Sequence, residues 1–372
     1  MTIKTDFVCN LSLDSNQIRL FYAENWDRGI ALTDKKFYDW QFLETPNGKK
    51  KDHCVVAYDE QKKEVLGVMG LNKRKFFLDG KSINGAELTT WIVSDKATRS
   101  GVGAKILGFI QSNFDILIGM GITNMALPIY MRSGFRFMQN IPRFIRVINF
   151  EKIKEYSTFN NLAIKLIKKW SSLSLTKYIA SEVNDENYKE LFNSIKTNLN
   201  LFSRDNNNRK WRYGKHPYFK YKEYIISDLK ASPKSSSYVA LREELNLREF
   251  KILHVMDLFG NTKSLPLALS FIEMYAIDKG FDLIDFYCTT SSIYRFMLCS
   301  GWFSTTDDLC FQFPHLFHPI EMRNPPTTSL IYWSKNNLIS MADLSKLYIS
   351  KQDADLDRPT LKTINAIKDL SN

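Results

Sequence analysis

The sequence lacks the usual marks of secreted and membrane-spanning proteins. Its five cysteines are an odd number and none forms a CxxC pair, so a disulfide framework and a zinc site are both poorly supported. The longest apolar stretch, Ile116 to Tyr130, is interrupted by glycines, an asparagine and a proline, so we expect no membrane span. No apolar segment follows a basic start at the N-terminus, so we expect no secretory signal and a cytoplasmic protein.

Signatures of nucleophilic and metal chemistry are missing as well. The sequence contains no G-x-S-x-G elbow, and no cysteine has an assignable histidine partner. His315 and His318 stand three residues apart without a third ligand cluster, so we expect no metal site. His254 and Asp257, also three apart in a predicted strand, point to opposite faces and form a poor dyad.

The composition predicts two folded domains. The chain has 372 residues, of which 44% are hydrophobic and 13% aromatic, enough for a core in each half. Lys and Arg exceed Asp and Glu by 51 − 40 = 11, but this charge is spread over short runs. We therefore expect solvated basic faces and attraction to a small phosphorylated ligand, and no nucleic-acid partner.

The chain contains two similar halves. A Trp-x-aromatic pattern with a proline six residues after the Trp begins at Trp40 and again at Trp211, an offset of 171. A weaker match relates Tyr130–Phe135 to Met297–Trp302, an offset of 167. Two matches in the same order at nearly one offset predict duplicated domains of about 150 residues.

The predicted secondary structure follows one course in both halves: antiparallel strands, then a strand–turn–helix–strand unit. The predicted elements are strands at 53–58, 65–71, 75–78, 81–83, 87–93, 238–243, 250–259 and 283–287, and helices at 102–114, 153–170, 265–279 and 361–370. This order predicts an α/β (α+β) fold of two tandem domains, each a mixed, mostly antiparallel sheet flanked by helices. We place the first domain at 1–150, a connecting helix and linker at 151–175, and the second domain with a C-terminal helix at 176–372.

The turn after the strand at 87–93 is the most informative motif. It reads Arg99-Ser100-Gly101-Val102-Gly103-Ala104 and leads into a helix. Small residues at a helix start let the backbone approach a ligand, and the first-turn N–H groups point outward without helical partners. That combination binds phosphate or pyrophosphate. The turn is neither a Rossmann G-x-G-x-x-G nor a Walker A loop.

This strand, turn and helix, followed by a further strand and Tyr130-x-x-x-Gly-Phe, resembles the GNAT family of CoA-dependent N-acyltransferases over roughly residues 50–147. The resemblance implies that the amides of Arg99, Ser100, Gly101, Val102, Gly103 and Ala104 hold the CoA pyrophosphate. It implies that the strand of Trp91, Ile92 and Val93 pairs with the pantetheine and the thioester carbonyl. Thr98 departs from the Gln or Arg that begins the family's pattern.

The resemblance also implies two catalytic residues. Tyr130 matches the tyrosine that protonates the departing thiolate, and an ordinary phenol pKa near 10 keeps it protonated at neutral pH. Glu87 lies 14 residues before Gly101, where some relatives place a glutamate base. Asp95 is less favoured. The alternatives are a packing role for the Tyr130 ring and a solvent-facing Glu87.

The second half departs from this pattern at the positions that carry chemistry. Gly260 to Pro266 contains no G-x-G at the helix start, and Met297 stands where the first half has Tyr130. We therefore predict one acyl-CoA site, in the first half, with a degenerate second half that supports it or helps to hold the acceptor.

The whole chain is similar to tandem-GNAT proteins of surface-polysaccharide biosynthesis, through the Trp-x-aromatic marks and Asp353-Ala-Asp-Leu-Asp-Arg-Pro359. This resemblance implies transfer from acetyl-CoA or 3-hydroxybutyryl-CoA to a nucleotide-linked amino sugar, such as a dTDP-3-amino-3,6-dideoxyhexose. Arginine suits a diphosphate and aromatic rings suit a base or sugar. The candidate substrate-binding residues are Trp40, Trp211, Arg212 and Tyr213.

Three other interpretations stay open: a protein or peptide N-acetyltransferase, a tRNA-dependent aminoacyl or peptidyl transfer protein, and a non-catalytic binding module. An intact phosphate turn in the first half counts against the second of these. The oligomeric state is not predicted by the sequence.

Overall fold

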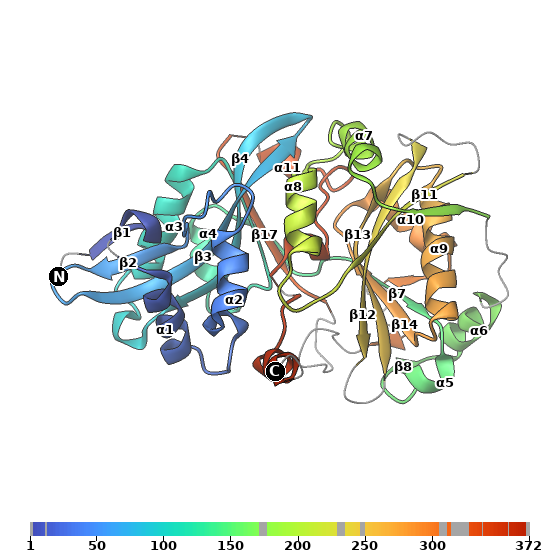
Figure 1. Ribbon diagram of the computed structural model, residues 1–372, viewed down its shortest axis with the longest axis horizontal. Helices are drawn as coiled ribbons and strands as arrows, with labels where there is room; N and C mark the ends of the chain where they lie inside the picture. The colour runs from blue at the N-terminus through green and yellow to red at the C-terminus, as the bar shows by residue number, and fades with distance from the viewer. Residues whose placement is uncertain are drawn as a thin grey trace.

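The protein forms two lobes that lie side by side along its long axis (Figure 1). The structure is a computed structural model that describes residues 3–11, 13–170, 177–228, 235–245, 250–304, 311–313, 327–336, 338–355 and 357–369. Within these ranges, no helix has the length and apolar character needed to cross a membrane. Each lobe is built on a mixed sheet with helices packed against it, which confirms the predicted fold class.

The first copy of the repeat supplies most of the first sheet. Its elements are β1 (Ile3–Phe7), α1 (Ser15–Asn25), α2 (Lys35–Tyr38), β2 (Val55–Asp59), β3 (Glu64–Leu78), β4 (Lys81–Val93), α3 (Val102–Asn113), β5 (Ile116–Met120), α4 (Leu127–Arg132), β6 (Arg136–Met138) and β7 (Arg143–Val147). The expected hairpin turn at Asp79 and Gly80 is present, with φ of 49° and 78°. The short strands expected on each side of it are parts of the long strands β3 and β4.

The segment between the two copies differs from its prediction. It contains α5 (Phe150–Ile153), β8 (Thr158–Phe159) and α6 (Asn161–Trp170), so the single helix expected over 153–170 is wrong. Thr158 and Phe159 favour extended backbone and pair with β16 (Phe311–Gln312). The Asn160 side chain then accepts from the Ala163 N–H at 2.8 Å and starts a new helix.

The second copy repeats the order of elements of the first. Its elements are β9 (Ile179–Glu182), α7 (Asp185–Ile195), β10 (Leu201–Phe202), α8 (Asn206–Arg209), β11 (Lys222–Ser227), β12 (Ser237–Leu245), β13 (Lys251–Gly260), α9 (Leu265–Asp278), β14 (Leu283–Tyr287), α10 (Ser291–Cys299), β15 (Phe303–Ser304), β17 (Leu330–Ser334), α11 (Leu338–Met341) and α12 (Leu361–Asp369). The predicted C-terminal helix thus corresponds to α12.

The first copy gives one strand to the second sheet, and the second copy gives two strands to the first sheet. β7, from the first copy, lies between β14 and β15, and β17, from the second copy, lies between β5 and β6. The first sheet therefore has the order β1-β2-β3-β4-β5-β17-β6, with β10 also paired to β3, and the second has β15-β7-β14-β13-β12-β11-β9. Figure 1 shows β7 among the strands of the second lobe and β17 beside the first. The domain limits 1–150, 151–175 and 176–372 stay a prediction, because each sheet contains strands from both sides of these limits.

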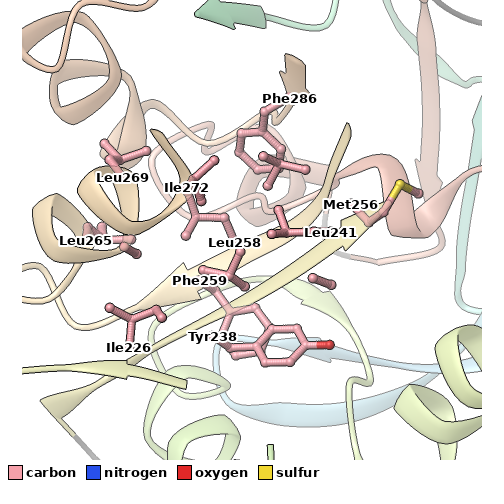
Figure 2. Close-up of a cluster of buried hydrophobic side chains, with 14 of the residues drawn as sticks. Ile226, Tyr238, Leu241, Met256, Leu258, Phe259, Leu265, Leu269, Ile272 and Phe286 are labelled. Atoms are coloured by element: carbon pink, nitrogen blue, oxygen red, sulfur yellow. The ribbon is translucent and has the colours of Figure 1, made fainter. Parts of the chain in front are cut away.

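Helix α9 packs the core of the second lobe (Figure 2). Leu265, Leu269 and Ile272 on this helix contact the sheet residues Leu258 and Phe286, and all five are at most 4% exposed. Burying an aliphatic or aromatic side chain of this size contributes about 1.5–3 kcal/mol. The apolar pattern of the second copy is therefore kept for packing, although its chemical positions differ from those of the first.

Candidate functional site

Strand β4 separates from β5 part-way along its length. The parallel pairing of the two strands covers only Gly85 to Leu88 of β4, whereas β4 continues to Val93. The edge of β4 beyond Leu88 therefore presents peptide groups that β5 does not pair. A substrate that carries amide and carbonyl groups can add to such an edge as another strand would.

A bulge in β4 turns this segment toward α3. The register with β3 shifts between Met69 and Leu71, so that Leu88 and Trp91, three residues apart, both contribute to the core beneath α3. A bulge inserts one residue and moves all later side chains to the other face. The backbone of Trp91, Ile92 and Val93 is consequently left on the open edge of β4, at the end nearest to the α3 turn.

The turn before α3 has the shape expected of an anion cradle. Arg99 and Gly101 have φ of 66° and 80°, and Gly101 is the residue that precedes the helix. The N–H of Lys105 donates to the Gly101 carbonyl at 3.1 Å as the first helical bond, so the N–H groups of residues 102–104 have no helical acceptor. A Cβ at Gly101 would meet no atom within 4 Å, so the space above the turn is open. These features fit a CoA pyrophosphate.

Trp91 and Tyr130 pack together between the turn and α4. Their ring centroids are 5.1 Å apart, and Tyr130 also contacts Phe135 at 5.0 Å. A Cβ at Gly103 would approach the Trp91 ring to 2.9 Å, so this glycine lets the indole lie against the first turn of α3. Burial raises the pKa of the Tyr130 hydroxyl, which keeps it protonated near neutral pH. The structure thus brings Trp91 and Tyr130 into contact beside the predicted cradle.

Glu87 lies on the opposite face of β4, buried between the two lobes. It is 5% exposed, so the solvent-facing alternative is wrong. Burial raises the pKa of Glu87 from 4.5 to about 7, and Arg74 opposes this shift. The opposing contacts are long: Asn72 and Arg74 donate to the same Glu87 oxygen at 3.4 and 3.5 Å. A carboxyl group with this pKa changes protonation at neutral pH, as a general base must. Asp95, the less favoured candidate, is exposed.

The two Trp-x-aromatic marks meet at the interface of the lobes. Each lies on a π-helical turn, at Asp39–Leu43 and Lys210–Gly214. The Trp40 and Trp211 rings stack at 5.3 Å, and each indole N–H donates to the backbone carbonyl of the other, at 3.0 and 2.8 Å. Rings engaged in this way hold the lobes together, and their role in binding a nucleotide stays a prediction.

A small cavity joins these marks to Glu87. It has a volume of about 20 Å³, room for about one water molecule. Trp40, Trp211, Arg212 and Glu87 line it together with Asp355. Tyr213, the remaining candidate, is buried nearby and does not line the cavity.

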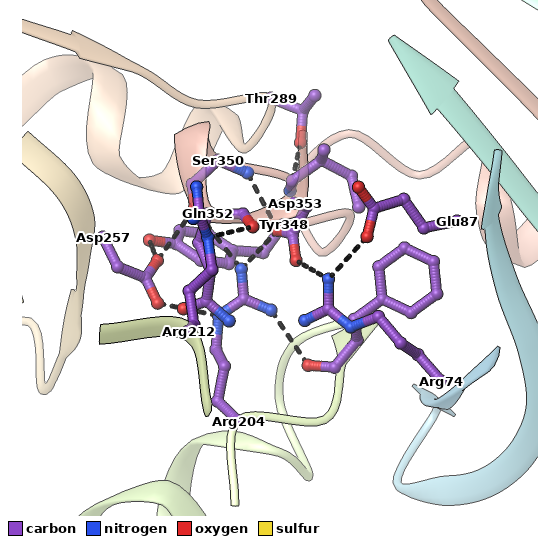
Figure 3. Close-up of polar contacts among 12 residues, drawn as sticks. Arg74, Glu87, Arg204, Arg212, Asp257, Thr289, Tyr348, Ser350, Gln352 and Asp353 are labelled. Carbon is purple, nitrogen blue, oxygen red and sulfur yellow. Dashed lines mark hydrogen bonds and ion pairs between the residues drawn. The ribbon is translucent and has the colours of Figure 1, made fainter. Parts of the chain in front are cut away.

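A buried ion-pair network next to the lining residues Gln352 and Ala354 ties the lobes together (Figure 3). Asp353 pairs with Arg74 of β3 at 3.1 Å and also with Arg204, which in turn pairs with Asp257 of β13 at 2.9 Å. All four side chains are at most 2% exposed. Each charge has an opposite neighbour, as burial at this depth requires.

The C-terminal segment 350–358 supplies acidic groups that the sequence analysis treated only as a mark of resemblance. Asp355 accepts from the Thr90 hydroxyl at 3.3 Å, and Arg358 donates to the same hydroxyl at 2.9 Å, directly on the open part of β4. Asp357 pairs with Arg242 at 2.8 Å. Two features of the sequence could have indicated these acidic contacts. Aspartates stand at every second position in 353, 355 and 357, and arginines lie in apolar strands such as β3.

The corresponding edge in the second copy is already occupied. β13 pairs with β14 only as far as Val255 and then continues to Gly260 without β14. In the same way, β4 continues beyond its pairing with β5. There the Tyr348 hydroxyl accepts from the Leu258 N–H at 3.0 Å. An offset of 167 makes Leu258 the counterpart of Trp91 and His254 the counterpart of Glu87. The chain itself therefore fills the edge that is open in the first copy.

Two pairs of residues, His254 with Asp257 and His315 with His318, were discounted in the sequence as weak catalytic or metal candidates. His254 lies between Asp285 and Glu244, at 2.7 and 3.0 Å. The expectation that His254 and Asp257 point to opposite faces is wrong, because a bulge shifts the register of β13 with β12 between them and places both on one face. His315 and His318 lie outside the described residues. Within the described ranges, no group of three or more His, Cys, Asp or Glu side chains is arranged to hold a metal ion.

Solved structures show which fold this arrangement represents. No protein-family model and no curated protein matches the sequence. A GCN5-related N-acetyltransferase from Anabaena variabilis matches with a TM-score of 0.50 at 13% identity, over 76% of this chain and 65% of that chain, less than two thirds of its length. Saccharomyces cerevisiae N-myristoyltransferase with bound myristoyl-CoA matches with a TM-score of 0.50 at 10% identity, over 89% of this chain and 79% of that chain.

These likenesses establish the fold at identities too low to establish more. The chain has the fold of GNAT-type N-acyltransferases, arranged as two copies.

Proposed function

We propose that the protein is an N-acyltransferase that moves an acyl group from acyl-CoA to an amine, without a metal ion. The observation that carries the proposal is the open edge of β4 beyond Leu88, followed after residues 94–98 by the turn at Arg99–Ala104, which is open above Gly101. The N–H groups of residues 102–104 would receive the CoA pyrophosphate, whereas the Ser100 N–H donates to the Ala97 carbonyl at 3.1 Å. The backbone of Trp91, Ile92 and Val93 would pair with the pantetheine and the thioester carbonyl.

The reaction we propose is direct attack of the amine on the thioester. Glu87, or a water in the cavity beside it, takes the proton from the amine as the C–N bond forms. Backbone N–H groups of the β4 edge stabilise the oxyanion of the tetrahedral intermediate. When the C–S bond breaks, the Tyr130 hydroxyl donates its proton to the departing thiolate, and CoA is released.

The acceptor we propose is a nucleotide-linked amino sugar, such as a dTDP-3-amino-3,6-dideoxyhexose, with acetyl-CoA or 3-hydroxybutyryl-CoA as donor. This choice rests on the resemblance to tandem-GNAT proteins of surface-polysaccharide biosynthesis and on the net charge of +11. Arg358, whose side chain is 21% exposed, adds a cation beside Thr90 at the open edge of β4. Trp40, Trp211, Arg212 and Tyr213 stay candidates for positioning this acceptor.

The test is release of CoA thiol from acetyl-CoA and 3-hydroxybutyryl-CoA in the presence of dTDP- and UDP-linked amino sugars, with peptides bearing a free N-terminal amine as a parallel series. Release that depends on one amino sugar supports the proposal in full. Release with peptides alone keeps the transferase and overturns the acceptor. Failure to bind CoA overturns the transferase itself.

A further inference from the structure

The second lobe contains a cavity that acyl transfer in the first lobe does not use. It has a volume of about 440 Å³, within the range of small-ligand sites. Its wall comes from the end of β13 and the following turn, the starts of α9 and α10, the end of α7, and the loop before Leu347. The lining residues are Ser194, Ile195, Asn198, Leu199, Phe259, Gly260, Asn261, Thr262, Leu265, Ser292, Ile293 and Ser345.

The internal repeat identifies this place. The end of β13, the turn and the start of α9 are the counterparts of the end of β4, the anion turn and the start of α3. The turn in the second copy is shorter: Asn261 and Ser264 are three positions apart, whereas Ser94 and Gly101 are seven positions apart. The cavity therefore occupies, in the second copy, the position that the anion turn has in the first. It lies beyond the strand edge that Tyr348 covers.

The cavity cannot hold an anion as the first copy's turn would. Ser264 and Leu265 donate their N–H groups to the Asn261 carbonyl, at 3.0 and 3.1 Å, and Pro266 has no N–H group. At the start of α10, the Ser291 N–H donates to the Leu344 carbonyl at 2.9 Å. The N–H groups of Ser264, Leu265 and Ser291, which could otherwise face a phosphate, are therefore used within the protein.

The polar side chains of the wall are all uncharged, from serine, threonine and asparagine. Ser194 and Ser345 donate their hydroxyl protons to protein oxygens at 2.7 and 2.6 Å, and Asn198 donates its amide to a carbonyl at 3.4 Å. Their lone pairs are left for a ligand. No lining residue carries a charge, and apolar side chains such as Phe259 and Ile293 complete the wall. A neutral ring with hydroxyl groups, which both donate and accept hydrogen bonds, matches this uncharged surface.

We propose that this cavity is a binding site for a neutral, hydroxyl-rich ligand, a sugar ring without phosphate. The site does not depend on acyl transfer, although it contacts the same chain segment. Ser345 in its wall lies on the stretch that continues to Asp353 and Asp355 beside Glu87. In the second copy, the sugar site thus stands where the first copy has its predicted phosphate site.

The test is saturation-transfer NMR on the full chain, with methyl hexosides, N-acetylhexosamines, hexose 1-phosphates and a neutral tripeptide as probes. Ser292→Trp places a ring at the mouth of the cavity from an exposed position, and Ser291→Trp is the matched control on the adjacent exposed residue outside the wall. We expect neutral sugars to bind at least tenfold more tightly than their phosphates. We expect Ser292→Trp, but not Ser291→Trp, to weaken neutral-sugar binding at least tenfold.

Three results would overturn the proposal: no neutral sugar binds, hexose phosphates bind equally well or the tripeptide binds in their place, or both tryptophan variants bind sugar equally well. CoA binding, measured separately on the same samples, reports on the first lobe. Loss of CoA binding with sugar binding intact would overturn acyl transfer and leave the sugar site standing.

Discussion

Replacement of Glu87 by glutamine tests both its burial and its role as a base. Burial raises the pKa of Glu87 from 4.5 to about 7. In the wild-type protein, log kcat/KM should therefore rise with unit slope up to about pH 7 and then level off. Glu87→Gln should lower kcat by about 10²–10⁴-fold and remove this acidic limb, because amide nitrogen and oxygen accept no proton at these pH values.

The same substitution has a consequence for stability with a defined sign. Because the pKa is raised on folding, the folded protein holds this proton more tightly than the unfolded chain, so the contribution of Glu87 to stability falls as the pH rises from about 4.5 to about 7. The difference between these pKa values corresponds to about 3 kcal/mol. Relative to wild type, Glu87→Gln should gain up to about 3 kcal/mol between pH 4 and pH 8.

Urea unfolding of both proteins at several pH values measures this difference, and pH profiles of CoA release measure the catalytic effect. Asp355→Asn is the control, since Asp355 is the other carboxylate beside the open part of β4. A stability difference that stays constant from pH 4 to pH 8 would refute the raised pKa. An acidic limb that persists in Glu87→Gln and disappears in Asp355→Asn would assign the base to Asp355.

Three further substitutions test the cradle, the acid and the ion-pair network. Gly101→Val should abolish CoA binding in a direct titration, because a β-branched residue strains a φ of 80°. The control is Gly108→Ala, at an exposed position in the middle of α3. It should leave CoA affinity unchanged and stabilise the fold by about 0.5–1 kcal/mol. Tyr130→Phe should lower kcat by about 10²–10⁴-fold while changing stability by less than about 0.5 kcal/mol, since its ring contacts remain; full turnover would remove Tyr130 as the acid. Asp353→Asn should destabilise the protein by about 3–5 kcal/mol in urea unfolding, because Arg74 loses a buried partner, and a change under about 1 kcal/mol would contradict this account.

The parts of the site that depend on local sequence were predictable. The turn before α3 begins at the expected residue, because glycine at a positive φ and a following apolar helix are local patterns. The strand of Trp91, Ile92 and Val93 was predictable for the same reason, whereas no helix was expected around Tyr130, which lies on α4. The contact between Trp40 and Trp211 was not predicted, because a repeat shows that two residues correspond without showing that they touch.

The parts that depend on distant contacts were not predictable from one sequence. Burial of Glu87 results from packing of the second lobe, and the network around Asp353 joins residues more than 140 positions apart. The exchange of β7 and β17 has no local signal, because both strands are short and almost wholly buried, and their sequences do not say which sheet buries them. The prediction of one helix over 153–170 was wrong, because the pairing of β8 with β16 decides the conformation of that segment.

Exchange of β7 and β17 sets a condition on how the protein is made. The first sheet lacks the strand between β5 and β6 until Leu330–Ser334 has left the ribosome, so a nascent chain with both earlier strands complete still exposes two unpaired edges. Synthesis at about 5–20 residues per second leaves this gap open for roughly 10–40 seconds. Separate expression of the two halves should give aggregation-prone products, whereas co-expression of both halves should recover folded protein through strand pairing.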